Sequence, residues 1–147
     1  MTTVAASSQT TERSLDRPVM TLDLPAILGS MKQEATWRVA RRNAMTLVKQ
    51  PIFRVVLVAL QAGAEIGAHE TEGPITVQAI EGRLAIHVGA EEFILGAGQL
   101  LVLSQGLRHT IRAQEDSAFL LTLAADSLHP AENLGDARIE VDDVELR

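Results

Sequence analysis

Between residues 44 and 124, short apolar runs alternate with clusters of glycine, proline and charged residues. Runs of this kind, with turn residues recurring about every eight to twelve positions, are typical of antiparallel sheets closed into a sandwich or barrel. The pattern therefore predicts an all-β domain. The expected strands are 44–48, 52–61, 75–80, 83–88, 91–95, 99–103, 109–113 and 118–124.

The two ends of the chain have other patterns. Residues 1–20 are rich in Ser, Thr and charge without periodicity, which predicts a flexible tail. Pro25 opens an amphipathic stretch that predicts a short helix at about 25–34. After Asp126 the chain is acidic and turn-rich. The expected organisation is a tail at 1–20, a barrel domain at 21–126 with its core at about 45–125, and a C-terminal extension at 127–147 that ends in an edge strand or a loose segment at 139–146.

Three of the strand-like runs, 55–60, 100–103 and 119–121, do not alternate apolar with polar residues. A strand with one face in water should alternate, so the outer faces of these runs need a cover. The N-terminal segment or a second subunit can supply it. Because closed two-fold dimers are the commonest soluble oligomers, we expect a homodimer.

Composition narrows the function classes. The 147 residues suit one domain, contain no cysteine and carry a formal net charge of −6. A phosphate-binding protein normally presents a basic face, so we expect no nucleic acid partner. No apolar run is long enough for a bilayer and no apolar leader is evident, which favours a cytoplasmic protein without a membrane partner.

One segment, 32–49, is locally basic. Its plainest interpretation is a solvated surface, and the alternative is a docking surface for an acidic partner or anion. Trp37 lies within this segment, and we expect it to be a packing anchor.

Two stretches place a histidine at a fixed interval after a glycine, each between apolar runs, and together they resemble the two motifs of the cupin superfamily. This resemblance covers roughly residues 50 to 125. It implies a cupin (double-stranded β-helix, or jelly-roll) barrel around a metal or small ligand. The matching positions are Gly63, His69 and Gly82 in the first stretch and Gly98, Gly106 and His109 in the second.

The departures from the motifs fall on the usual metal ligands. Thr71 stands in place of the second histidine, Ile75 in place of the glutamate, and Ser104 in place of a proline. The resemblance then leaves His69 and His109 as the metal-ligand candidates, for a weakly held iron, manganese, nickel or zinc ion. Glu70 and Glu72 lie close by in sequence, but strand parity points both away from His69.

The expected ligand pocket is mostly apolar with a few polar points, as small-ligand sites generally are. Gln78 belongs to it only if a bulge turns the side chain inward. His87 and His129 are expected on the surface or in packing roles. The candidate pocket residues are His69, Thr71, Ile75, Val77, Gln78 and His109.

Three functions remain open. The first is a single-domain cupin that binds a small molecule beside an incomplete metal site. The second is a metal-dependent enzyme, dioxygenase- or isomerase-like, that uses His69 and His109. The third is a protein-interaction scaffold that docks through the basic segment. No catalytic residue is assigned, because no nucleophile elbow or phosphate-binding loop occurs.

Overall fold

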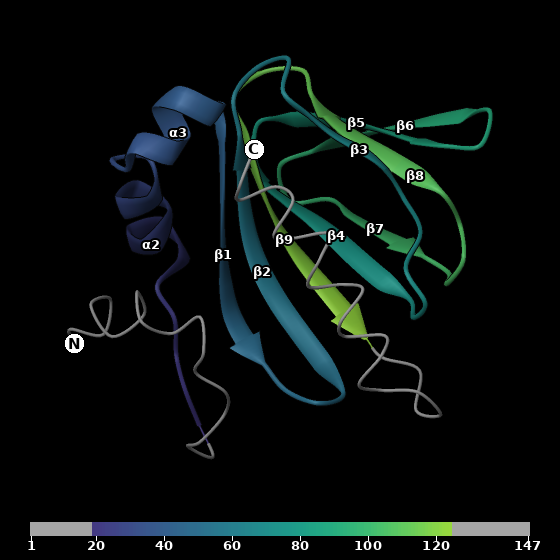
Figure 1. Ribbon diagram of the computed structural model, residues 1–147, viewed down its shortest axis with the longest axis horizontal. Coiled ribbons are helices and arrows are strands. Elements are labelled where there is room, and N and C mark those ends of the chain that lie inside the picture. The colour runs from purple at the N-terminus through teal and green to yellow at the C-terminus, as the bar shows by residue number, and fades with distance from the viewer. Residues whose placement is uncertain (1–18, 125–147) are drawn as a thin grey trace.

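The computed structural model describes residues 19–124, in which two short helices precede nine strands (Figure 1). The expected flexible tail therefore lies almost wholly outside the described residues. The C-terminal extension, His129 and the edge strand at 139–146 lie outside them as well. None of the described helices is long and apolar enough to cross a membrane.

The strands match the predicted all-β class, and a short helix precedes them as expected. The helices are α2 (Leu24–Met31) and α3 (Ala35–Ala40). The strands are β1 (Arg42–Lys49), β2 (Phe53–Leu60), β3 (Glu65–His69), β4 (Ile75–Glu81), β5 (Arg83–Val88), β6 (Glu91–Gly96), β7 (Leu100–Leu103), β8 (His109–Ala113) and β9 (Ser117–Ala124).

Two elements have no counterpart in the sequence prediction. Strand β3 has a single large apolar residue, Ile66, so it lacks the periodicity that marks the other strands. Helix α3 is six residues long and buries none of its residues fully, so its sequence has no apolar stripe that would predict a helix. It ends at Arg41, whose φ of 65° is left-handed and turns the chain into β1.

The strands form two antiparallel sheets that face each other (Figure 1). One has the order β1-β2-β9-β4-β7 and the other the order β3-β8-β5-β6. Alternate residues of both sheets meet in one apolar core, as the strand period of two requires. Its central members are Val56, Val58, Ile75, Val77, Leu84, Ile86, Ile111, Phe119, Leu121 and Leu123.

The N-terminal segment covers the outer face of the five-stranded sheet over β1, β2 and β9, and it was one of the two alternatives predicted for this cover. Ile27, Leu28 and Met31 of α2 form a second apolar cluster with outward residues of β1, β2 and β9. The Asn43 amide fastens this layer, because its Nδ2 donates to the Met31 carbonyl (3.0 Å) and to Glu34 Oε1 (2.8 Å). Trp37 packs against the same cluster, as expected for a packing anchor.

The turn between β4 and β5 depends on Gly82. Its φ of 83° lies in the region that glycine adopts without strain. A Cβ at this position would also collide with the Asp116 carbonyl and the Ser117 side chain, and would lie 2.7 Å from Ser117 Cα. The Asp116 carbonyl and Ser117 Cα are backbone atoms, which cannot rotate away as a side chain can.

We expect Gly82→Ala to lower the free energy of unfolding by more than about 2 kcal/mol, because left-handed strain and a backbone collision add. Gly98→Ala is the matched control: φ there is 89°, but nothing lies within 4 Å of the added Cβ. That control should lose only about 1 kcal/mol. Urea unfolding of both variants measures the difference, and equal losses would contradict the collision.

Candidate functional site

Both motifs of the sequence come together at one end of the barrel. Strand β3 ends at His69 and a short loop leads to Ile75, which begins β4. Strand β7 ends at Leu103 and a second loop leads to His109, which begins β8. Strands β1 and β5 also finish here, and β2 and β6 begin here. We call this end of the barrel, with its strand termini and loops, the histidine end.

The backbone places the two motif histidines directly opposite each other. His69 and His109 are Cα partners in the antiparallel pairing of β3 with β8. A bulge makes this register, since three residue steps on β3 span the two steps on β8 between Ile66↔Ile111 and His69↔His109. Both lie near the strand ends that carry the loops.

His109 faces the space between the sheets. Along β8 it shares its face with Ile111 and Ala113, both members of the core, and it is only 5% exposed. Its Nδ1 lies 3.0 Å from the Leu107 carbonyl oxygen. In the neutral tautomer with the proton on Nδ1, this hydrogen bond leaves Nε2 as an acceptor for a ligand donor or a metal.

Thr71 is buried, but its hydroxyl group is used within the loop. Its Oγ1 donates to the Gly73 carbonyl at 2.9 Å. The Thr71 carbonyl in turn accepts from the Gly106 backbone N–H at 2.8 Å. These two bonds join the loops of the first and second motifs and give Thr71 a structural role at the histidine end.

Strand β4 contributes apolar surface to the interior. Ile75 and Val77 are buried in the core, on the inward face that they share with Ala79. Gln78 is exposed on the opposite face, so its inclusion among the pocket residues was wrong. The inward placement needed a bulge before Gln78, whereas the irregularity in this strand falls between Ala79 and Glu81.

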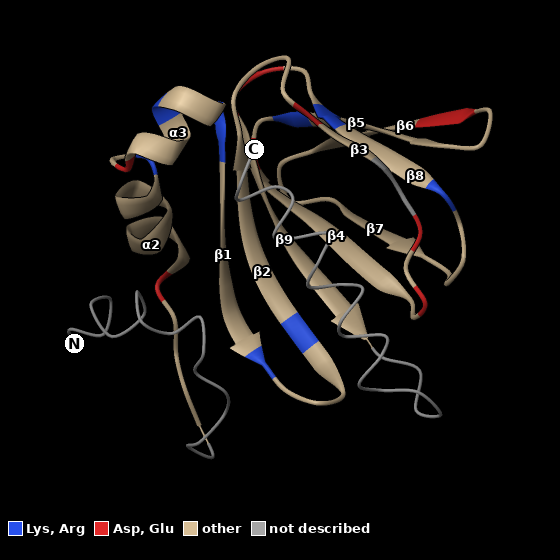
Figure 2. Cartoon of the chain, viewed as in Figure 1, with Lys and Arg blue, Asp and Glu red and all other residues tan. Residues whose placement is uncertain are grey.

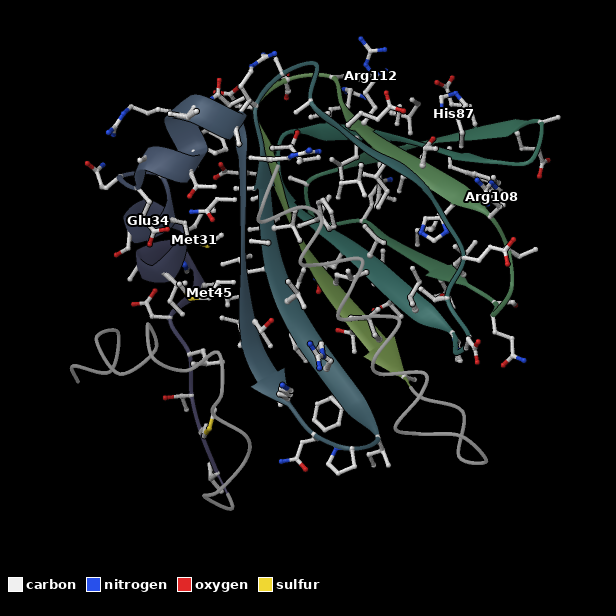
Figure 3. The ribbon with its side chains drawn as sticks, viewed as in Figure 1. Met31, Glu34, Met45, His87, Arg108 and Arg112 are labelled. Carbon is white, nitrogen blue, oxygen red and sulfur yellow. The ribbon has the colours of Figure 1, made fainter. Side chains whose placement is uncertain are left out.

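The nearby carboxylates and the remaining described histidine lie on the outside. Glu70 and Glu72 are exposed, and Glu70 Oε2 lies 4.0 Å from Arg108 Nη1. His87 Nε2 lies 3.3 Å from Glu92 Oε2, with both side chains half exposed. Figure 3 shows His87 and Arg108 away from the space between the sheets. The expected surface role of His87 is confirmed.

The donor groups at the motif positions do not fit a tightly held metal ion. A catalytic site usually has three protein ligands with a further position open. Ile75 has no donor atom, and the Thr71 hydroxyl is a weak donor already bonded to Gly73. In residues 19–124, no three His, Asp or Glu side chains are grouped to hold an ion.

Sequence reasoning missed Arg54, a charged residue buried inside the barrel. It is 2% exposed, and it lies on the β2 face that carries Val56 and Val58 of the core. The available signal was an arginine within the otherwise apolar run 52–60. A charge at an inward position of a strand is unusual, because a charged side chain is rarely fully buried unless it has partners.

The basic segment 32–49 does not present one free cationic surface. Lys32 Nζ lies 2.6 Å from Glu81 Oε2, and Arg41 donates to the Ala62 carbonyl. Arg42 Nη1 donates to the Glu65 carbonyl at 2.8 Å. Figure 2 shows basic positions on α3, on β1 and between the two helices. Lys32 joins the helical layer to β4, whereas Arg41 and Arg42 donate to backbone carbonyls of the barrel. Docking of an acidic partner by this segment stays a prediction.

Comparison with protein families gives one match, the cupin domain, over residues 56–124. That span begins in β2 and ends with β9. It therefore contains both motif stretches and both sheets. No match was found among the curated proteins.

Solved structures show the same fold at low sequence identity. A conserved protein of unknown function from Streptococcus pyogenes is 24% identical, with a TM-score of 0.58 over 74% of this chain and 89% of that one. A cupin superfamily protein from Desulfitobacterium hafniense is 17% identical, with a TM-score of 0.63 over 75% and 94%.

An enzyme is also similar in fold. Salicylate 1,2-dioxygenase from Pseudoaminobacter salicylatoxidans, studied as adducts with gentisate, is 14% identical with a TM-score of 0.67. The match covers 79% of this chain and only 36% of the dioxygenase. At this identity the likeness concerns the fold alone.

Proposed function

We propose that this chain, whose residues 56–124 match the cupin domain family, binds a small molecule inside its barrel, at the histidine end. The observation that carries the proposal is His109, a buried polar side chain on an otherwise apolar inward face. Its Cα partner in the pairing of β3 with β8 is His69, so the backbone of the second motif histidine lies at the same end. Apolar walls with a few polar groups are the usual construction of a small-ligand site.

The apolar part of the proposed site comes from both sheets. Ile75 and Leu103 are register partners on β4 and β7, and both belong to the core. On the facing sheet, Val88 is the register partner of His109. A ligand with an apolar body and a hydrogen-bonding group suits this mixture. The cytoplasmic location and the lack of a nucleic acid partner remain predictions from sequence.

This function is tested by the side-chain NMR signals of the histidines. A panel of small acids, alcohols and amides is first screened for fragments that raise the melting temperature. We expect those fragments to shift the His109 imidazole correlations. His87 is the internal control, because it lies half exposed on the outer face. Fragments that stabilise the protein while shifting only His87, or a panel with no stabilising member, would contradict a ligand site in the barrel.

The alternative is a metal-dependent enzyme that uses the two imidazoles. The register of His69 with His109 favours it, because a transition metal can take two histidines and complete its shell with solvent or substrate atoms. The donor groups at the motif positions argue against an enzyme, because they do not fit a tightly held metal ion. The two readings differ in how tightly the apo protein takes up metal.

We expect the wild type to bind iron, manganese, nickel and zinc more weakly than about 1 μM, because two neutral ligands hold such ions loosely. Thr71→His should tighten nickel or zinc at least tenfold by adding a third imidazole, and His109→Ala in that background should abolish the gain. Titration calorimetry measures both. Submicromolar metal in the wild type, lost on His109→Ala, would favour the enzyme.

We also propose a homodimer, formed through the outer face of β7. This strand ends the five-stranded sheet. Leu100 and Val102 are 55% and 68% exposed there, beyond the part of the sheet that the helices cover. A second copy would bury them and complete the cover that the sequence pattern requires.

Val102→Lys should convert this dimer into a monomer, because a desolvated ammonium in an apolar contact is costly. The matched control is Val39→Lys, which introduces the same charge at an 82% exposed position on α3. Light scattering after size exclusion gives the mass of each form. A monomeric wild type, or a dimer that persists in Val102→Lys, would rule out this interface.

A further inference from the structure

The hairpin of β5 and β6 presents an aromatic ring and a carboxylate on the side that faces the other sheet. On β5, Ile86 belongs to the core and Val88 packs against it. Their register partners on β6 are Phe93 and Glu91. Because directly opposite residues of two paired strands point to the same face, Phe93 and Glu91 share the inward face.

Both side chains stay accessible although they point inward. Phe93 is 38% exposed and Glu91 is exposed too, whereas Leu95, two residues further along the same face of β6, is buried in the core. The packed core therefore ends before Phe93 on this strand. Figure 2 shows the acidic start of β6 at the tip of the hairpin. An inward aromatic ring that is not fully covered is apolar surface that a ligand can bury.

The same face continues the row that holds His109. Val88 is the register partner of His109 on β8 and of Glu91 on β6. His109, Val88 and Glu91 therefore lie side by side across three strands. Two strand spacings, roughly 10 Å, separate the outer two backbones. A single small molecule can span that length.

The two polar groups of this row both accept hydrogen bonds. The bond from His109 Nδ1 to the Leu107 carbonyl leaves Nε2 as an acceptor in the neutral tautomer. The ionised carboxylate of Glu91 has acceptors only. A ligand that fits between them carries donor groups, and the donor beside Glu91 gains from a positive charge.

The ring of Phe93 strengthens the preference for a cation. It lies two residues from Glu91 on the same face of β6, and the face of an aromatic ring attracts positive charge. The fixed cations of this end lie elsewhere. Arg108 Nη1 is 4.0 Å from Glu70 Oε2, and Arg54 is on β2, three strands from the β7 edge that follows β6 in the chain.

We propose that the ligand of the barrel is an organic amine, bound as its ammonium ion by Glu91 and Phe93. Its apolar body extends from there towards His109, along the aliphatic surface of Val88. A carboxylate in the same position would be repelled by Glu91. This inference rests on the proposed small-molecule function and adds its chemical class.

The test compares three probes on the full chain: phenethylamine, 2-phenylethanol and phenylacetate. They share a ring and nearly a length, and differ in charge. NMR titration should show the amine binding roughly three- to tenfold tighter than the alcohol, because a largely exposed carboxylate and an aromatic face each add a modest attraction. Phenylacetate should bind more weakly than the alcohol. The amine should also shift the His109 imidazole signal, which locates it in the barrel.

Substitutions on β6 assign the preference to its residues. Glu91→Gln keeps the shape and removes the charge, and should weaken the amine about two- to fivefold while leaving the alcohol unchanged. The matched control is Glu92→Gln, which removes the same charge one residue further on, at an outward position beside His87. It should leave the affinity for the amine unchanged. Phe93→Leu should weaken the amine about two- to fivefold, and more than it weakens the alcohol.

The outcomes separate this inference from the function beneath it. An amine no tighter than its alcohol, or a preference that persists in Glu91→Gln or falls equally in Glu92→Gln, overturns the amine and leaves a small-molecule site standing. Failure of all three probes beside a stabilising fragment of another class does the same. Failure of the probes together with a fragment panel that yields no stabilising member removes both. A preference lost in Glu91→Gln and kept in Glu92→Gln establishes the class of ligand.

Discussion

The structure depends on strands that must be shielded from water on both faces. In β2, Val56 and Val58 face one apolar core and Leu57 and Ala59 face another, and β9 divides its residues in the same way. Burial of apolar surface is the main stabilising term, so neither layer can be dispensed with. The second sheet supplies one cover and the N-terminal helices supply the other.

This double requirement also fixes where chemistry can occur. The middle of the barrel is filled by apolar side chains of both sheets, and two buried ionisable side chains have inward positions towards the end where the motif loops lie. His109 and Arg54 are there, on facing sheets. The hydrogen bond from the Gly106 backbone N–H to the Thr71 carbonyl ties the two motif loops together at this end.

The sequence predicted the fold well where the pattern is strong. Eight of the nine strands were anticipated, since each has several apolar residues bounded by turn residues. The motif glycines Gly82 and Gly98 both have positive φ, a conformation that glycine adopts without strain. Strand β3 was not predicted, because Ile66 has almost no apolar neighbours among Glu65, Gly67 and His69. The position of this strand depends on its pairing with β8. Tertiary pairing of this kind has no local signature.

The site was predicted only in part. Motif spacing placed His109 and Ile75 at one end of the barrel, and parity placed Ile75 and Val77 inward. Neither motif spacing nor strand parity could identify Arg54. An arginine in an apolar run belongs to no motif, and its burial depends on which face of β2 turns inward. Gln78 was included on the assumption of a bulge, and the position of a bulge is set by the partner strands.

The extra residue in β3 has a consequence for how this protein can vary. From Ile66 onwards, the residue opposite His109 is chosen by one inserted position and not by counting along the strand. A deletion of a single residue between Ile66 and His69 would leave two steps on each strand, so the pairing would run without a bulge and His69 would still be paired with His109. In related chains, the loss of one residue from this short segment would then change the bend and twist of β3 while keeping the pair of histidines.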